Sequence, residues 1–380
     1  MRRRFMSQSD YLQPMYFEAV EDGLTISLPS YDIEYRIGID GEWQTLSAGE
    51  FTPSINSGTK IFFKKESKGQ LGSFSTNVGF RLGGDCRSLL YGEKATKDSP
   101  LYEDCFYRLF YNSLLVEVED NILPSTQLAK DCYSGMFSYC KKLVNAPKLP
   151  ATTLVAYCYE SMFIGCTSLT KTPELPATTL ANSCYRSMFN GCTSLVNAPE
   201  LPATTLANSC YAYMFYGCTN LSYIKMLATD ISAYDCLYYW VLGVASTGTF
   251  VKSKDATWDV VGDSGVPTGW TVITDEEESG GGDNIFPMYL TTEQGSGNDR
   301  TRDADEKSLA ILEYFNNNGI TDSAGTKYLT LDESRIFYID EFLITHMYSQ
   351  ANSIALAWDD MGFLVGYIRE DGRIELFYDD

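Results

Sequence analysis

The sequence predicts an α+β chain in three parts: an N-terminal β-sandwich-like domain, a central solenoid with 26-residue repeats, and a small α+β domain at the C-terminus. Three observations support this. Near copies of LPATTLANSCYRSMFNGCTSLVNAPE (175–200) recur on both sides of that segment. Short runs of alternating polarity precede the copies, as strands do. A charged, glycine-rich stretch then separates them from a segment with a helical pattern followed by strand patterns.

Residues 11–85 predict several short strands. LTISL (24–28) alternates apolar and polar residues, and IEYRIGIDGEWQTL (33–46) holds two strand-like runs about Asp40-Gly41, a hairpin signal. KIFFKK (60–65) and FSTNVGF (74–80) follow. Strands at this spacing are typical of a small antiparallel sandwich or roll.

Residues 123–226 form the repeat array, in which a step of 26 residues fixes whole columns of apolar side chains. Each copy carries leucines, two cysteines eight residues apart and a Met-Phe pair. One cysteine column is Cys132, Cys158, Cys184, Cys210 and Cys236; the other is Cys140, Cys166, Cys192 and Cys218. A single copy is too short to bury a core of its own, so the copies must stack and seal their edges with identical residues.

The flanks of the array predict caps. Residues 86–122 resemble a degenerate copy and predict an N-terminal cap, because terminal repeats are usually atypical. Residues 227–273 keep the column positions Leu227 and Cys236 and then abandon the pattern, which predicts a C-terminal cap.

Within one copy we expect two elements. Cys184, Met188 and Cys192 share the i, i+4, i+8 spacing of one helical face, which predicts a short helical or 3₁₀ segment over 184–192. Residues 194–202 contain Pro199 and Pro202 and are expected to be extended. Extended segments of successive copies would form a narrow parallel sheet, kept short because proline cannot donate to its ladder.

Residues 274–284 read as a linker, and 285–380 as a separate α+β domain. An amphipathic helix is expected over 303–319, and Thr330–Glu333 resembles a capping box for a second helix. SIALAW (353–358) and FLVGYIREDGRIELFY (363–378) predict three strands, the last two joined at Asp371-Gly372.

The chain is acidic, with a net charge of −21 in 380 residues. Asp and Glu outnumber Lys and Arg by 23 to 7 between residues 275 and 380, so most of the excess lies there. Such a surface repels phosphate backbones, and we expect no nucleic-acid partner. The longest apolar runs are too short for membrane insertion. MRRRFMSQSDYL at the start has the basic residues of a signal peptide without its apolar region, so a classical signal peptide is not expected.

The repeats resemble the BspA-like leucine-rich-repeat family of bacterial surface proteins and phage-associated proteins. MFxGCTSL followed by the LP step is similar to that family's AFxxCxSL and IP pattern, over about residues 105–240. The 26-residue step and Met-Phe in place of Ala-Phe depart from it. The resemblance implies a leucine-rich-repeat solenoid, surface display and adhesion, and no catalysis.

The cysteines, the single histidine and the clustered acidic residues fit structural roles better than roles in an active site. Zinc sites need cysteine pairs two to four residues apart, so pairs eight apart favour small buried thiols; disulfide rungs between copies remain an alternative. His346 is the single histidine and lacks a neighbouring nucleophile signature, and on a helix it would be structural. The acidic residues Asp299, Asp303, Asp305 and Glu306 lack the calcium-loop spacing and suit a helix start. We expect no enzyme, no metal and no cofactor.

Tyrosine supplies the candidate binding residues. Tyr139, Tyr157, Tyr213 and Tyr216 fall in columns that vary between copies, so they should face solvent. Exposed tyrosine offers a large, rigid contact area at low entropic cost. The sequence therefore predicts a non-enzymatic adhesion or recognition protein of a virion or cell surface, with a protein or a surface glycan of a cell as partner. The alternatives are an enzyme with a catalytic C-terminal domain, and a cytoplasmic interaction scaffold.

Overall fold

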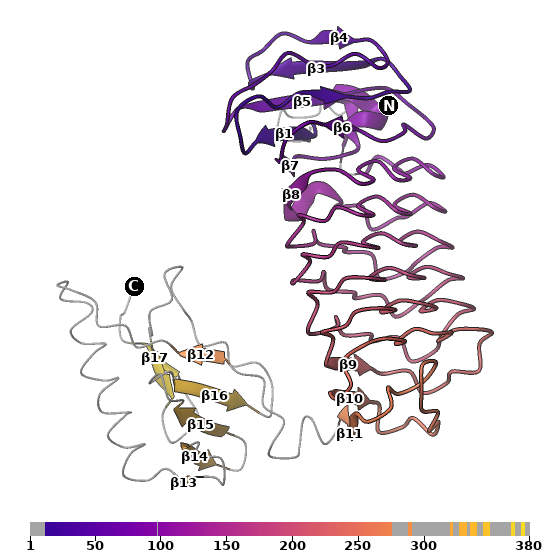
Figure 1. The fold of residues 1–380 in the computed structure, drawn as a ribbon, viewed down its shortest axis with the longest axis vertical. Coiled ribbons are helices and arrows are strands. Elements are labelled where there is room, and N and C mark those ends of the chain that lie inside the picture. Colours follow the sequence, from indigo (N-terminus) through magenta and orange to yellow (C-terminus); the bar gives the residue numbers. More distant parts are fainter. Residues whose placement is uncertain are drawn as a thin grey trace, which may run out of the picture. The chain divides into compact units, whose positions relative to one another are not determined.

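The computed structural model describes residues 12–96 and 98–275, and beyond them the backbones of the strands at 288–290, 320–321, 327–332, 335–339, 345–349, 366–368 and 374–376. The chain divides into two units, Met1–Thr274 and Asp275–Asp380. In the first unit, an N-terminal sheet covers one end of a stack of coils formed by the repeats (Figure 1).

The N-terminal sheet has six strands in the order β4-β3-β5-β1-β7-β8. They are β1 (Tyr16–Ala19), β3 (Ile33–Ile37), β4 (Gln44–Leu46), β5 (Lys60–Lys64), β7 (Phe80–Gly83) and β8 (Leu115–Val118). All neighbours are antiparallel except β7 and β8. A separate pair joins β2 (Ile26–Ser27) to β6 (Ser75–Thr76).

The predicted hairpin about Asp40-Gly41 is confirmed, because β3 and β4 pair antiparallel, with Ile33 opposite Leu46. The run KIFFKK is confirmed as β5, whereas β1 was not predicted. The last strand, β8, comes from the segment expected to cap the repeats, so the sheet extends past residue 85. That segment also holds α1 (Ser88–Tyr91), η2 (Gly92–Lys94) and η3 (Asp120–Ile122).

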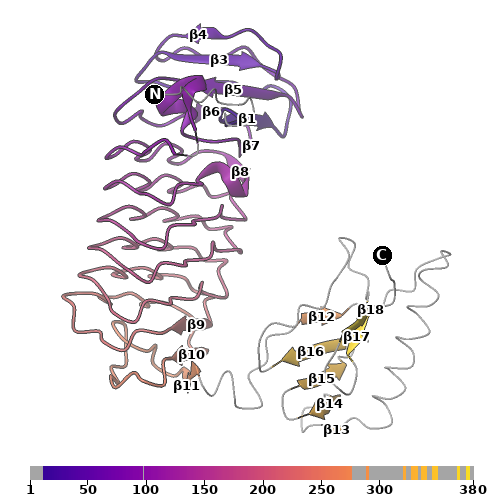
Figure 2. The same cartoon turned by 180° about the vertical axis from the view of Figure 1, so that it is seen from behind.

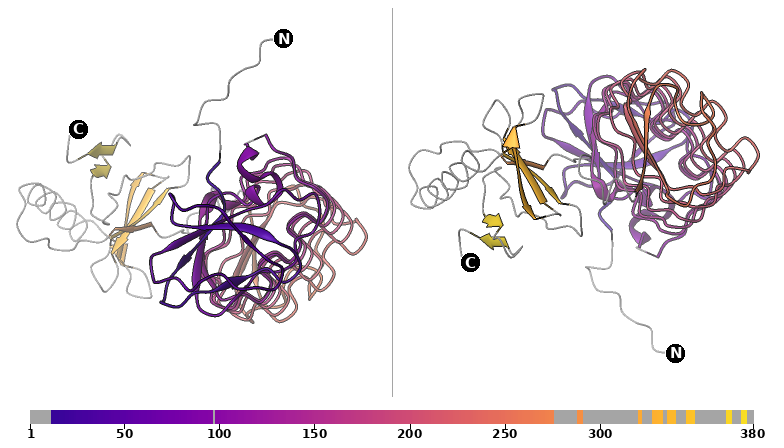
Figure 3. Two further views of the ribbon diagram at one scale, coloured as in Figure 1. Left: turned by 90° about the horizontal axis from the view of Figure 1, so that it is seen from above. Right: turned by 90° about the horizontal axis from the view of Figure 1, so that it is seen from below.

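Successive repeats lie on one another as coils joined by backbone hydrogen bonds. Every second amide of the Cys-to-Cys segment donates to the next coil: Tyr133 to the carbonyl of Cys158 (3.1 Å) and Phe137 to that of Met162 (3.0 Å). The amides between them donate three residues back, as Met136 does to Tyr133 (3.2 Å). Both kinds of buried amide are thus satisfied. Figures 2 and 3 show the coils overlying one another from behind and along the stack of coils.

The short helix expected over 184–192 is wrong, because these residues form a series of turns. A residue with left-handed φ recurs every four places, as at Ser183 (54°), Ser187 (55°) and Gly191 (73°). This period of four turns Cys184, Met188 and Cys192 inward just as one helical face would. The inward pattern alone could not separate the two backbones.

The expected parallel sheet is reduced to isolated bridges in the coils that contain proline, such as Asn145 with Lys171. Regular strands begin in the first coil that lacks this proline. Lys225 stands there at the position occupied by Pro147, Pro173 and Pro199 in the preceding coils. From there β9 (Tyr223–Met226), β10 (Thr249–Lys252) and β11 (Thr271–Thr274) form a parallel three-stranded sheet. Proline removes the ladder donor, and its loss restores the ladder.

The core of the coils consists of ring stacks. Phe110, Phe137, Phe163, Phe189 and Phe215 follow one another at centroid distances of 5.7 to 5.8 Å with interplanar angles of 4 to 9°. A second stack contains Tyr133, Tyr159, Tyr185 and Tyr211. The phenylalanine stack meets Phe74 of the N-terminal sheet region at one end, and both stacks meet Trp240 at the other. One continuous core therefore joins sheet, coils and cap.

The C-terminal cap is fixed by three indoles. Trp240, Trp258 and Trp270 each donate the indole N–H to a backbone carbonyl at 2.8 Å, those of Gly265, Ala228 and Ala245. By the 26-residue step Trp240 occupies the methionine place and Val241 the phenylalanine place, whereas Tyr238 and Tyr239 fall in variable columns.

The second unit is described by its strands. A five-stranded sheet has the order β12-β16-β15-β14-β13, formed by β12 (Met288–Leu290), β13 (Ile320–Thr321), β14 (Lys327–Asp332), β15 (Arg335–Ile339) and β16 (Thr345–Ser349). The helix expected from the box at Thr330–Glu333 is wrong, because Thr330, Leu331 and Asp332 lie in β14, which pairs antiparallel with β15. β17 (Gly366–Ile368) and β18 (Ile374–Leu376) confirm the hairpin about Asp371-Gly372. The expected helix over 303–319 and the strand over 353–358 lie outside the described residues.

We predict that Phe189→Ala in the middle of the stack lowers the free energy of unfolding by about 3–5 kcal/mol, because it opens a cavity between two stacked rings. Urea titration followed by circular dichroism measures the loss. Val196→Ala, at a side chain that is 49% exposed, is the matched control and should change stability by about 0.5 kcal/mol or less. Equal losses in both variants would contradict the stacked core.

Candidate functional site

The variable columns of the Cys-to-Cys segments come together on one side of the coils. Contacts across coils link them: Arg108 lies beside Gly135, Tyr139 lies over Gly165, and Arg186 lies beside Tyr213. The invariant Cys, Met and Phe columns point inward and are fully buried. We call this side of the coils the variable face. Its composition changes from coil to coil, whereas the inward columns stay the same.

The first of two aromatic groups on the variable face is the N-terminal aromatic cluster, formed by Tyr107, Arg108, Tyr111 and Tyr139. Tyr111 and Tyr139 meet edge to face at 5.6 Å, and the Arg108 guanidinium lies 5.2 Å from the Tyr107 ring and 5.3 Å from the Tyr111 ring. Tyr111 and Tyr139 are about two-fifths exposed. The arginine holds the rings in place by cation–π attraction.

The second is the C-terminal tyrosine cluster, formed by Tyr213, Tyr216, Tyr238 and Tyr239. Tyr213 is its centre, with ring centroids 6.1 Å from Tyr216, 5.3 Å from Tyr238 and 6.2 Å from Tyr239. The outer three are 38 to 40% exposed, and Tyr213 is half-buried. Desolvation, with Tyr213 and Tyr239 nearby, raises the pKa of Tyr238 above its ordinary value of 10.0, so this ring is uncharged at neutral pH.

Several of these tyrosines adopt a backbone conformation that tyrosine disfavours. Tyr139, Tyr157, Tyr213 and Tyr239 have φ of 60°, 61°, 57° and 47°. Other coils place Gly165, Ser161 or Ser183 at equivalent points. A bulky residue in the left-handed region is strained by roughly 1–2 kcal/mol. Stability therefore does not explain tyrosine at these points.

The four tyrosines predicted from the sequence do not form one site. Tyr139 lies in the N-terminal aromatic cluster, Tyr213 and Tyr216 lie in the C-terminal tyrosine cluster, and half-buried Tyr157 contacts no other described aromatic ring. Sequence reasoning missed Tyr107, Tyr111, Tyr238 and Tyr239. A 26-residue step through Cys236 would have found Tyr238 and Tyr239, and a step of 27 that aligns Cys105 with Cys132 would have found Tyr107 and Tyr111.

Between the two clusters the variable face carries an ion pair. The Arg186 side chain lies 3.6 Å from the Glu160 carboxylate and 5.5 Å from the Tyr213 ring. Burial raises the pKa of Glu160, and Arg186 opposes that shift. The pair is neutral as a whole, so it adds no net charge to the variable face.

The eleven cysteines are free, buried thiols, which confirms their predicted place in the core. In one column the thiol donates to the carbonyl of a phenylalanine in the preceding coil: Cys140 to Phe110 (3.1 Å), Cys166 to Phe137 (3.1 Å) and Cys192 to Phe163 (3.2 Å). Burial raises the pKa of Cys140 from 9.0 to about 11. Such thiols are poor nucleophiles.

The described part of the chain contains no group of three or more His, Cys, Asp or Glu residues placed to hold a metal ion. His346 lies on β16, opposite Tyr338 and Tyr289, so the expectation that it sits on a helix is wrong. Asp299, Asp303, Asp305 and Glu306 lie outside the described residues.

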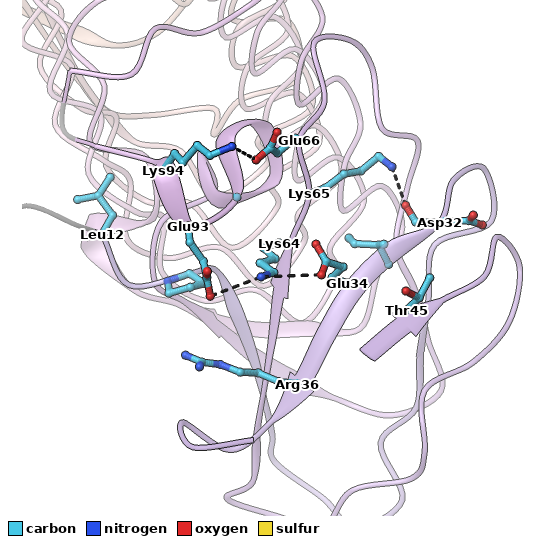
Figure 4. Close-up of a pocket in the computed structure, with 13 residues that line it drawn as sticks. Leu12, Asp32, Glu34, Arg36, Thr45, Lys64, Lys65, Glu66, Glu93 and Lys94 are labelled. Atoms are coloured by element: carbon cyan, nitrogen blue, oxygen red, sulfur yellow. Dashed lines mark hydrogen bonds and ion pairs between the residues drawn. The ribbon is translucent and has the colours of Figure 1, made fainter. Parts of the chain in front are cut away.

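An open hollow of about 990 Å³ lies beside β3 and β5 of the N-terminal sheet (Figure 4). Its cations have partners: Lys64 lies 3.4 Å from Glu93, Lys94 lies 2.7 Å from Glu66, and Lys65 donates to the carbonyl of Asp32 at 2.6 Å. Arg36 packs over Trp43 at 4.8 Å. The lysines of the lining thus have partners within it, and an anion would have to displace those partners to bind them.

The chain matches no protein-family model, and neither a curated protein nor a solved structure matches it. Among the described residues, none of the helices has the length and apolar character needed to cross a bilayer. The variable face is therefore interpreted on its own geometry.

We predict that the free energy of unfolding falls as the pH rises from about 9 to about 11. The thiol of Cys140 ionises near pH 9 when unfolded and near pH 11 when folded, so the folded state keeps its proton through this window while the unfolded state loses it. The contribution of the protonated Cys140 thiol to the free energy of unfolding is fully present below pH 9 and is lost as the pH rises toward 11. Urea midpoints at pH 7, 9 and 10.5 measure the fall, and Cys140→Ala should make it shallower. A midpoint that rises with pH would contradict the buried thiols.

We also predict that the native chain resists alkylation. Iodoacetamide at pH 8 should modify few of the eleven thiols in an hour, because they are buried and protonated. The same reagent in guanidinium chloride is the control and should modify all of them, as counted by mass spectrometry. Rapid labelling of several thiols in the native chain would show that the coils open.

Proposed function

We propose that the chain is a non-enzymatic recognition or adhesion protein that presents its variable face to a protein or a glycan on a cell surface. The observation that carries this proposal is the strained tyrosine. Copies that are nearly identical inside differ on the variable face, and they place tyrosine where glycine or serine would cost less. Strain kept at an exposed position favours a binding role over a structural one.

The fold supports this role in a second way. The amides of each coil bond to the next coil, and the ring stacks continue from the sheet to the cap. A face on such a support loses little conformational freedom on binding, and tyrosine adds few rotatable bonds. The two clusters are therefore held ready at fixed positions.

The place of action belongs to the same proposal. We place the chain in a virion, as a structural or tail-associated protein of a phage, or on a bacterial surface. The resemblance of the repeats to the BspA-like family favours these two places. A cytoplasmic scaffold and an enzyme are the competing outcomes of the tests.

The proposal predicts that the full-length chain, fluorescently labelled, binds intact bacterial cells in a saturable manner. The test variant replaces two tyrosines by residues that other coils carry at the equivalent places, Tyr139→Gly and Tyr213→Ser. This variant should be at least as stable as the wild type in urea, because it relieves backbone strain, and it should lose most of its binding. Binding is measured by flow cytometry across a panel of strains. Absence of binding to every strain would overturn an adhesion role.

Fractionation tests the place of action. Mass spectrometry should find the chain in purified phage particles or among peptides shaved from intact cells by protease. Recovery from the cytosol alone would contradict both and favour the scaffold.

A further inference from the structure

The C-terminal tyrosine cluster has a size that limits what it can bind. A tyrosine that is two-fifths exposed presents on the order of 80 Å², so Tyr213, Tyr216, Tyr238 and Tyr239 together present roughly 300 Å². A stable protein interface needs about 800 Å² from each partner. The cluster covers less than half of that area. One to three sugar rings, by contrast, fit a patch of this size.

The charge of the cluster points to the same class of ligand. Arg186 lies over the Tyr213 ring and is paired with Glu160, so it brings no net charge to the cluster. The rings carry hydroxyl groups and no charge at neutral pH. Aromatic faces bind the C–H surface of a sugar, and hydroxyls of both partners exchange hydrogen bonds. A neutral ligand with apolar faces and polar edges matches this chemistry, whereas an acidic or basic one does not.

A strip without side chains runs beside the rings. Gly191, Gly217 and Gly243 occupy the column that follows Tyr216 in the coil, and a Cβ added to any of them would meet only the glycine of the preceding coil, at 3.5 to 3.9 Å. All three are at least partly exposed. In the N-terminal aromatic cluster the ring of Tyr139 covers this strip at Gly165. Beside the C-terminal tyrosine cluster it stays open, and a ligand can approach the backbone closely.

The geometry points to a carbohydrate-binding site: the C-terminal tyrosine cluster and the glycine strip bind a short neutral glycan, one to three sugar rings long. The inference rests on the proposed function and names its partner class. The rings of Tyr216 and Tyr238 are the stacking platforms, Tyr213 is the support between them, and the strip gives room for the ring edge. A single contact area of this size implies weak binding, with a Kd of about 0.1–1 mM.

The test uses the full-length chain on an array of neutral and acidic oligosaccharides, followed by titration of the bound glycan by ligand-observed NMR. The cluster variant is Tyr213→Ser, Tyr216→Asn, Tyr238→Ala and Tyr239→Ser. The first three replacements occupy the equivalent place in the preceding coil, and serine occupies the Tyr239 place two coils earlier, at Ser187. The matched control is Tyr111→Ser with Tyr139→Gly, the residues at the equivalent places of the following coil, Ser138 and Gly165.

We expect the wild type to bind at least one neutral glycan, the cluster variant to bind it at least tenfold more weakly, and the control to stay within twofold. Urea midpoints and circular dichroism verify that both variants fold. Binding of acidic glycans alone, binding of none, or equal binding by the cluster variant would overturn the inference.

The two proposals fail differently. If the wild type binds cells and the neutral glycans do not compete, the glycan inference fails and the recognition function stands. Loss of cell binding after protease treatment of the cells would also assign the partner as protein. If the wild type binds no cells, the recognition function itself fails.

Discussion

The alternation of amide donors along each coil is the constraint on which the rest of the molecule depends. One N–H bonds back three residues, and the next reaches to the following coil. This pattern requires a left-handed residue every four places, because the chain must turn without closing a helix. It leaves no buried amide of the segment without a partner, and it sets the coils at the spacing at which the phenylalanine rings stack.

That constraint divides each repeat into positions of two kinds. Inward positions meet the same residue of the next coil, so Cys184, Met188 and Phe189 can change only if their neighbours change too. Outward positions meet solvent and can differ from coil to coil. The tyrosines of the variable face exploit the second kind, at the cost of local strain at Tyr139 and Tyr213. The molecule thus combines a uniform interior with an individual surface.

The sequence predicts the inside of the coils well and their backbone poorly. The column of Cys132, Cys158 and Cys184 marks the buried edge directly, because identity between copies reports packing between copies. The helix over 184–192 is wrong because a spacing of four is common to helical faces and to a series of turns. Side-chain periodicity cannot tell these apart; Gly191, at a left-handed point, is the clearest local signal of a turn.

For a related reason the sequence predicts which tyrosines face outward but not how they group into a site. Variation between copies identifies Tyr139 and Tyr216 as outward, but the grouping of tyrosines depends on contacts between coils, which the column pattern does not contain. Tyr238 was missed because the last coil departs from the repeat after Cys236, although the 26-residue step from that cysteine places it in the column of Arg186 and Ala212. The strand pattern at 223–226 was likewise set by the loss of proline, a change of one residue type at one column.

Because each coil bonds only to its neighbours, the number of repeats sets the distance between the two ends of the stack of coils. Duplication or deletion of one 26-residue unit would leave the sheet at one end and the indole-fixed cap at the other intact, and would move the two aromatic groups apart or together by one coil thickness, about 5 Å. Lineages could therefore adjust the reach between two contact points in fixed increments without redesigning either of them.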